Sequence, residues 1–303
     1  MLTASSRTDH ILGGVQVALS ACLFGVIIIL AKVATGQGLP IPIILGVRFA
    51  MATGLLAILL RVLRQSFRPA SGEGPWLAAL AIGGYVFSAS LVYVALHHGQ
   101  ASAVAPLAYS YPIFVALGSV MLGERPPGLL VALSLALALG GAFLVVGAPG
   151  GLLSVEPVAV ALICISSLCF AGYILLWNRV ISRTPPLTGA LWVNASAGTA
   201  LLAFAAVRGD TSTHIASLQW GLLLAMGVTG AVALTMLFQG IRRIGPVRTA
   251  ILGAFEPLSA AAIAFVALGD PLRVRTVTGG LLILAGATLA TLARPAPPPE
   301  PYP

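Results

Sequence analysis

Long apolar runs, interrupted by glycine, proline and isolated charges, dominate the pattern of hydrophobic and polar positions along the chain. A helix of about 20 apolar residues can cross a lipid bilayer. The runs therefore predict an all-α membrane protein with ten membrane-spanning helices. We place these spans at residues 11–35, 41–63, 76–98, 101–122, 126–147, 156–182, 187–207, 217–241, 246–268 and 273–292. Most connections are short, which leaves no room for a soluble domain.

The composition agrees with a membrane protein and excludes other classes. Charged residues make up 8% of the 303 residues, whereas a soluble domain carries about 25%. The formal net charge is +8, but the basic residues are scattered and form no stripe of the kind that binds nucleic acid. The cysteines Cys22, Cys164 and Cys169 lie within apolar runs and form no CxxC pair. We therefore expect neither a disulfide nor a zinc site.

The positions of lysine and arginine predict the orientation, because cytoplasmic connections are enriched in both. If the N-terminus is cytoplasmic, the outer connections hold only Arg208, Arg273 and Arg275. Lys32 and Arg48 fall within spans, and every other basic residue lies on the cytoplasmic side. Both termini are thus predicted to be cytoplasmic. The proline-rich residues 295–303 are predicted to form a disordered tail.

An internal repeat divides the chain. Residues 95–146 resemble residues 240–292: Pro112 aligns with Pro257, and "LGERP" aligns with "LGDPL". The repeat unit is five spans, so we predict a first half of residues 1–150 and a second half of residues 151–294. Because five is odd, the second half must enter the membrane from the opposite side. Such inverted repeats are typical of secondary transporters, whose substrate site lies near the midplane.

The segments that close the two halves carry a more specific resemblance. "APLAYSYPIFVALGSVMLGERP" and "GAFEPLSAAAIAFVALGDPL" resemble the drug/metabolite transporter superfamily, EamA-type branch, and the chain is most similar there to YddG-type exporters of aromatic amino acids. The resemblance implies a carrier of the bacterial inner membrane that exports small metabolites, above all aromatic or hydrophobic amino acids. It implies no metal, nucleotide or other cofactor and no covalent chemistry, and it is compatible with a monomer.

Other functions remain open at this point. A multidrug exporter or an exporter of other metabolites would have the same fold. A small channel is the alternative from another class, although a channel usually lines its path with rings from several subunits. An intramembrane enzyme is disfavoured, because the sequence contains no HExxH, no GxSxG and no paired aspartate motif.

Ionisable residues within spans are functional candidates, because burying a charge in a bilayer is costly. Glu256 precedes Pro257 in the ninth span. It is either the partner of backbone groups that the proline frees or a site for a proton or a substrate ammonium. Arg48 and Lys32 could each pair with a substrate carboxylate or extend to the lipid headgroups, and we favour the headgroups for Lys32.

Aromatic and amide side chains predict the wall of a cavity. Ser166, Phe170, Tyr173 and Trp177 recur at helical spacing and share one face. A cavity lined in this way suits a flat apolar zwitterion, and its ring faces favour an ammonium group. Pro112 and Pro257 are the predicted hinges. The full set of predicted cavity residues is Tyr85, Ser88, Tyr93, Tyr109, Tyr111, Tyr173, Trp177, Asn178, Gln239, Glu256 and Arg48.

Overall fold

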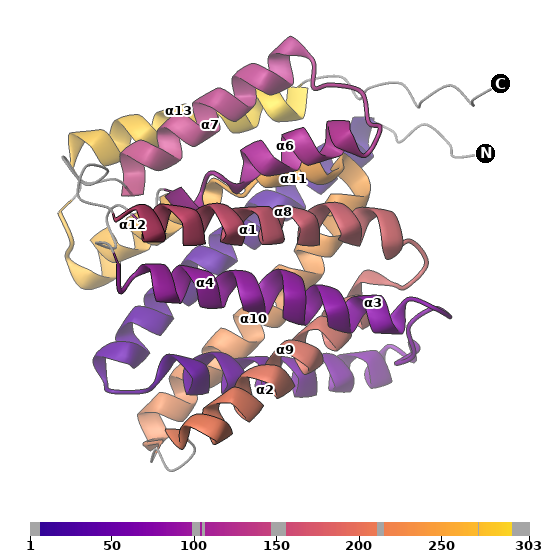
Figure 1. Ribbon diagram of the computed structural model, residues 1–303, viewed down its shortest axis with the longest axis vertical. Coiled ribbons are helices and arrows are strands. Elements are labelled where there is room, and N and C mark those ends of the chain that lie inside the picture. The colour runs from indigo at the N-terminus through magenta and orange to yellow at the C-terminus, as the bar shows by residue number, and fades with distance from the viewer. Residues whose placement is uncertain are drawn as a thin grey trace.

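The computed structural model describes residues 7–98, 104, 107–146, 156–210, 215–271 and 273–292, and in these ranges it is helical without any strand (Figure 1). The helices are α1 (Arg7–Gly36), α2 (Ile41–Val62), α3 (Gly74–Ala79), the π-helix η1 (Leu80–Val86), α4 (Phe87–Ala95), α6 (Tyr111–Met121), α7 (Leu129–Val146), α8 (Pro157–Val180), α9 (Pro186–Arg208), α10 (Ser217–Ile244), α11 (Pro246–Leu252), α12 (Phe255–Leu268) and α13 (Val274–Leu292).

Nine segments of the described chain are long and apolar enough to cross a membrane. One of them joins α3, η1 and the start of α4, and another joins α11 and α12. These nine match the predicted spans except for 101–122. That range contains the shorter apolar helix α6 and residues that lie outside the described ranges. The all-helical membrane fold is confirmed, while the ten-span repeat and the cytoplasmic termini stay predictions.

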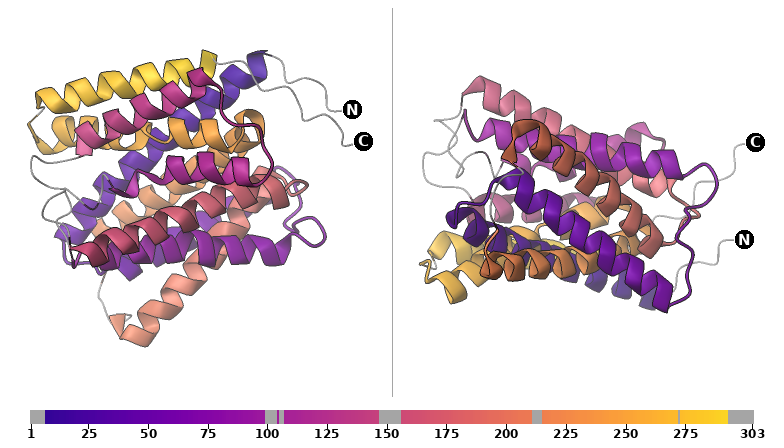
Figure 2. Two further views of the ribbon diagram at one scale, coloured as in Figure 1. Left: turned by 45° about the horizontal axis from the view of Figure 1, so that its top comes forward. Right: turned by 90° about the horizontal axis from the view of Figure 1, so that it is seen from below.

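Helices from the two predicted halves pack against each other. The pairs with the most extensive contact are α1 with α10, α2 with α9, and α7 with α13, and Figure 1 and the left view of Figure 2 show α7 beside α13. The last pair is close because Gly141 of α7 and Gly279 of α13 face each other at its crossing. A Cβ on Gly141 would lie 2.5 Å from the Gly279 carbonyl oxygen. Small residues of this kind let membrane helices approach.

Two helices are interrupted near their prolines. A turn at residues 109–110 precedes α6, and a turn at residues 253–254 separates α11 from α12. Pro112 and Pro257 both lie in the first turn of the helix that follows. A proline is tolerated there because the N–H groups of a first turn have no partner within the helix. Each break therefore lies just before its proline.

A further irregularity occurs in the third segment, where η1 is a seven-residue π-helix. It contains Gly84, and a Cβ at this position would lie 2.7 Å from the Cβ of Tyr173 in α8. The glycine thus allows η1 and α8 to approach closely. Short π-helices are frequent at functional sites, and this one carries Tyr85.

Two connections meet at the end of the bundle where α1 begins. The Glu73 carboxylate accepts hydrogen bonds of 2.9 Å from the backbone N–H groups of Arg183 and Thr184, and the Arg183 Nε atom lies 3.6 Å away. Arg242 donates to the carbonyl oxygens of Ile181 and Thr184. We call Glu73, Arg183, Thr184 and Arg242 the Glu73 cluster. It joins the α2–α3 connection to the α8–α9 connection.

Candidate functional site: a cavity between the helices

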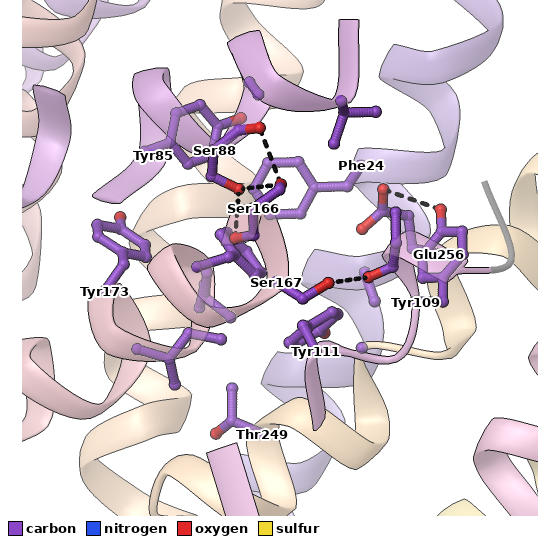
Figure 3. Close-up of a pocket in the computed structure, with 18 of the residues that line it drawn as sticks. Phe24, Tyr85, Ser88, Tyr109, Tyr111, Ser166, Ser167, Tyr173, Thr249 and Glu256 are labelled. Carbon is purple, nitrogen blue, oxygen red and sulfur yellow. Dashed lines mark hydrogen bonds between the residues drawn. The ribbon is translucent and has the colours of Figure 1, made fainter. Parts of the chain in front are cut away.

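A cavity of about 380 Å³ lies halfway along the helices, beside Phe24 of α1 and Phe170 of α8. Its wall comes from α1, η1, α4, α6, α8, α10, α11 and α12 and from the turn before α6. Both predicted halves therefore contribute to it. The residues that carry polar groups or rings into the cavity are Ser20, Phe24, Tyr85, Ser88, Tyr109, Tyr111, Ser166, Ser167, Phe170, Tyr173, Thr249 and Glu256 (Figure 3).

One wall of the cavity is a cluster of aromatic rings around Phe170. Its ring makes an edge-on contact with Tyr111, with centroids 4.9 Å apart, and it stacks on Tyr173 at 5.8 Å. Tyr85 approaches from η1, 6.4 Å from Phe170 and 6.0 Å from Tyr173. These geometries are the favourable ones for aromatic pairs, so the cluster forms a firm apolar surface.

Hydroxyl groups join α4 to α8 beside these rings. The Ser88 and Ser166 hydroxyl oxygens lie 2.9 Å apart. Ser166 Oγ also lies within donating distance of the Ser88 carbonyl oxygen, at 2.9 Å, and Ser88 Oγ lies 3.0 Å from the Ser166 carbonyl oxygen. Because both side chains are buried, this mutual bonding satisfies polar groups that would otherwise be costly there.

The two helix breaks are completed by side chains from the opposite half. The Tyr111 hydroxyl, just after the first break, donates to the Ala250 carbonyl oxygen of the second break at 3.4 Å. Ser167 of α8 donates to the Ala108 carbonyl oxygen before the first break at 3.5 Å. A break leaves carbonyl groups without their helical partners, and membrane proteins tolerate such backbone where it lines a cavity.

Glu256 lies at the second break and lines the cavity. Its Oε1 atom accepts a hydrogen bond of 3.3 Å from the Tyr109 hydroxyl, and Figure 3 shows the two side chains together on one side of the cavity. The Glu256 carbonyl oxygen is bound separately, by the Ser259 hydroxyl at 2.9 Å. The carboxylate therefore has a tyrosine as its partner, while a serine satisfies the backbone.

The two basic residues within spans have different surroundings. Lys32 forms an ion pair of 3.3 Å with Asp270, and both side chains are at least half exposed. Arg48 is only 5% exposed, and its Nη2 atom donates to the Tyr85 hydroxyl oxygen at 3.3 Å. Arg48 therefore does not reach a helix end, although it does not itself line the cavity.

The predicted cavity residues separate into two groups. The structure brings Tyr85, Ser88, Tyr109, Tyr111, Tyr173 and Glu256 together around the cavity. Three others lie elsewhere: Trp177 is buried against Phe238, Gln239 accepts a hydrogen bond from Gln16, and Asn178 is absent from the cavity wall. The Tyr93 side chain is outside the described part of the chain.

Among the lining residues that carry polar groups or rings, sequence reasoning missed four. Ser20 and Phe24 lie four residues apart in α1 and share one of its faces. That spacing was visible, but the surrounding run is apolar on every side and did not reveal which face lines a cavity. Ser167 and Thr249 bond mainly to backbone groups, a pattern that is common for such residues in any helix.

The described residues around the cavity carry no metal-binding cluster. Among them, no group of three or more His, Cys, Asp or Glu side chains is arranged to hold a metal ion. The cavity instead combines rings, hydroxyl groups and one carboxylate, which are groups that recognise a small molecule.

Comparison with known proteins decides the family. The model of the EamA-like transporter family matches residues 11–147 and matches again at residues 157–292. The chain belongs to the EamA-like transporter family. It is thus a multi-pass membrane transporter of the drug/metabolite transporter superfamily, whose members are in general transporters rather than enzymes, and it acts on a small molecule within a lipid bilayer.

The relatives of this EamA-like transporter agree with that assignment. It is 26% identical to an uncharacterized transporter of Archaeoglobus fulgidus over 92% of this chain and 96% of the relative. It is also 26% identical to the uncharacterized inner membrane transporter YicL of Salmonella typhimurium, over 65% and 66% of the two chains. For the uncharacterized transporter YcbK of Bacillus subtilis the identity is 24% over 77% of each chain.

A solved crystal structure shows the same fold. It superposes with a TM-score of 0.78 at 20% sequence identity, covering 91% of this chain and 95% of the other. At this identity the likeness concerns the fold alone.

Proposed function

We propose that this EamA-like transporter exports amino acids with aromatic or hydrophobic side chains across the bacterial inner membrane. The observation that carries the proposal is the cavity, whose volume of about 380 Å³ falls within the range of small-molecule sites. Six of its lining residues are aromatic, several others carry hydroxyl groups, and one carries a carboxylate. Such a wall offers apolar burial to a ring, and its hydroxyl groups and carboxylate offer hydrogen-bond partners to the polar groups of an amino acid.

Alternating access between the two halves is the proposed mechanism. The family model matches residues 11–147 and 157–292 separately, which supports two five-span repeats within residues 1–150 and 151–294. The odd span number then gives inverted halves with both termini cytoplasmic. In this proposal Pro112 and Pro257 act as hinges, because each follows a break that borders the cavity.

A second candidate substrate is an organic amine, as in a multidrug exporter. The observation in its favour is that Glu256 is the only charged residue in the cavity wall that the structure describes. A lone carboxylate beside several rings suits a cation without a carboxylate of its own. The two candidates differ in one chemical group, so the same assay separates them.

Counterflow in proteoliposomes tests the proposal. Vesicles containing the purified transporter are loaded with unlabelled tryptophan or phenylalanine, and the uptake of the labelled amino acid is followed. Saturable exchange is expected for a carrier. Flux that rises linearly with the gradient indicates a channel. Exchange of tryptamine without any exchange of amino acids would replace the proposal by the amine exporter.

A further inference from the structure

Arg48 is a buried cation without an acidic partner. It is 5% exposed, and none of the ion pairs among the described residues includes it. Its Nε atom is buried without a hydrogen-bond partner there. Gly230 of α10 provides the room, since a Cβ on that residue would lie 3.4 Å from Arg48 Nη1. A charge within a bilayer is costly and is usually retained for a function.

The contact between Arg48 and Tyr85 determines the direction of a hydrogen bond. A guanidinium group only donates, so the Tyr85 oxygen accepts from Arg48 at 3.3 Å. The hydroxyl proton of Tyr85 must then point elsewhere, and the described residues provide no acceptor for it. Because Tyr85 lines the cavity, its O–H group is available as a donor to a bound molecule, with a positive charge behind it.

The Tyr109 hydroxyl donates its proton to Glu256, whereas the Tyr85 hydroxyl oxygen accepts a hydrogen bond from Arg48. An ionised carboxylate only accepts, so Tyr109 donates its proton to Glu256 Oε1 at 3.3 Å. Tyr109 and Glu256 both line the cavity, so an ionised Glu256 provides a hydrogen-bond acceptor at this end.

The donor end and the acceptor end are separated by aromatic rings. The Phe170 ring lies between those of Tyr85 and Tyr111, at 6.4 Å and 4.9 Å between centroids. Figure 3 shows Tyr85 and Glu256 on opposite sides of the cavity, with Phe24 between them. The ammonium and carboxylate of an α-amino acid sit on the same carbon atom, so they cannot occupy both ends at once.

We propose that the cavity holds its substrate lengthwise, with a carboxylate at the Tyr85 hydroxyl and a hydrogen-bond donor of the side chain at Glu256. Arg48 is then a positioning residue that selects for the carboxylate through Tyr85. This inference rests on the proposed amino-acid export. It ranks the substrates: tryptophan, with its indole N–H, and tyrosine, with its phenol, bind better than phenylalanine, which has no side-chain donor.

The test measures competition against labelled tryptophan by tryptophan, phenylalanine and tryptamine in proteoliposomes. The unmodified transporter is expected to prefer tryptophan to both other ligands by about tenfold or more, as a hydrogen bond to a charged or polarised group implies. Tyr85→Phe and Arg48→Gln are expected to abolish the preference over tryptamine. Glu256→Gln is expected to weaken the preference over phenylalanine, because its neutral amide oxygen accepts a weaker hydrogen bond than the carboxylate does.

Two variants separate a specific effect of Arg48 from misfolding and from the general loss of a charge. Tyr85→Phe removes only the hydroxyl group and keeps the ring contacts, so it remains informative if Arg48→Gln does not fold. Arg61→Gln removes a charge from an exposed position of the same helix and is expected to leave all three affinities unchanged. Equal effects of Tyr85→Phe on tryptophan and tryptamine would overturn the inference while leaving export intact. Absence of amino-acid exchange in the unmodified protein would instead refute the proposed function.

Discussion

The Glu73 cluster joins two connections at one end of the bundle, and the substitution Glu73→Gln tests whether it acts as a latch between conformations. Glu73 is 4% exposed, and its two oxygen atoms accept one backbone N–H group each at 2.9 Å. Glutamine has the same shape but only one acceptor oxygen. Its amide nitrogen would face one of these N–H groups and leave it without an acceptor.

The free-energy cost of Glu73→Gln follows from the hydrogen bonds that the substitution removes. Hydrogen bonds to a charged group contribute about 1.5–3 kcal/mol each, and a neutral one about 1 kcal/mol. Replacing two charged bonds by one neutral bond therefore costs the closed arrangement about 2–3 kcal/mol, after allowing for repair by water at this end. If the bonds exist only when this end is closed, the equilibrium shifts toward opening by about 30- to 140-fold.

The stability of the Glu73 cluster is expected to decrease in acid. Burial raises the pKa of the Glu73 carboxyl, but the hydrogen bonds from Thr184 and Arg183 outweigh it, so the pKa lies below its ordinary value of 4.5. Closure is then fully stabilised above pH 4.5 and weakens as the pH falls through the pKa of the folded protein. The other charged side chains of the cluster are those of Arg183 and Arg242.

Thiol labelling measures the opening. Thr249 lines the cavity from α11, so we place a single cysteine there, in a chain whose native cysteines are replaced by serine. A membrane-impermeant maleimide is added to vesicles in which the transporter is oriented with its Glu73 cluster toward the external solution. Glu73→Gln should raise the labelling rate by one to two orders of magnitude. Acid below pH 4.5 should raise the rate only in the protein that retains Glu73.

The matched control is Glu124→Gln, which removes the same charge from an exposed position at the same end. It should leave the labelling rate unchanged. A lower unfolding temperature for Glu73→Gln with an unchanged labelling rate would refute the latch, because Glu73 would then stabilise the connections equally in every conformation.

The remaining predictions concern the hinges and the closest helix pair. Pro112→Ala and Pro257→Ala should slow transport more than they reduce the yield of folded protein, since a first-turn proline replaces no helical hydrogen bond; equal losses of both would contradict the hinge role. Gly141→Ala should destabilise the protein by about 1–3 kcal/mol through overpacking, because its Cβ would meet the Gly279 carbonyl at 2.5 Å. Gly140→Ala, whose Cβ would have open space around it, should be tolerated in the same thermal unfolding measurement.

The ends of the helices could be predicted well from the sequence alone. The ranges 41–63, 187–207 and 217–241 correspond to α2 (Ile41–Val62), α9 (Pro186–Arg208) and α10 (Ser217–Ile244). The bilayer fixes the length of an apolar run, and a charge or a proline marks its end. Both signals are local in the sequence, so no knowledge of the tertiary structure is needed to place them.

The composition of the cavity wall could be predicted only in part. Tyr173 and Trp177 lie on one face of α8, as their spacing indicates, yet Tyr173 lines the cavity and Trp177 stacks on Phe238 with centroids 3.4 Å apart. Helical spacing gives the face of a residue but not where along that face the cavity ends. The extent of the cavity along α8 depends on which helices cross it. The sequence pattern of a single helix does not contain this information.

The hydrogen bonds that join the two predicted halves are weaker beside the cavity than in the Glu73 cluster. The bonds from Tyr109, Tyr111 and Ser167 at the two breaks are 3.3–3.5 Å long, beyond the usual range for hydroxyl donors. Such bonds are weak and can be exchanged for bonds to a substrate at little cost. The Glu73 bonds are 2.9 Å long and charge-assisted, so they are strong. Under the proposed alternating access, the weak bonds allow the cavity to adapt to its substrate, and the strong bonds of the cluster favour the conformation in which they form. Substitutions at the breaks should therefore change which substrate is carried, whereas substitutions in the cluster should change how often the transporter opens.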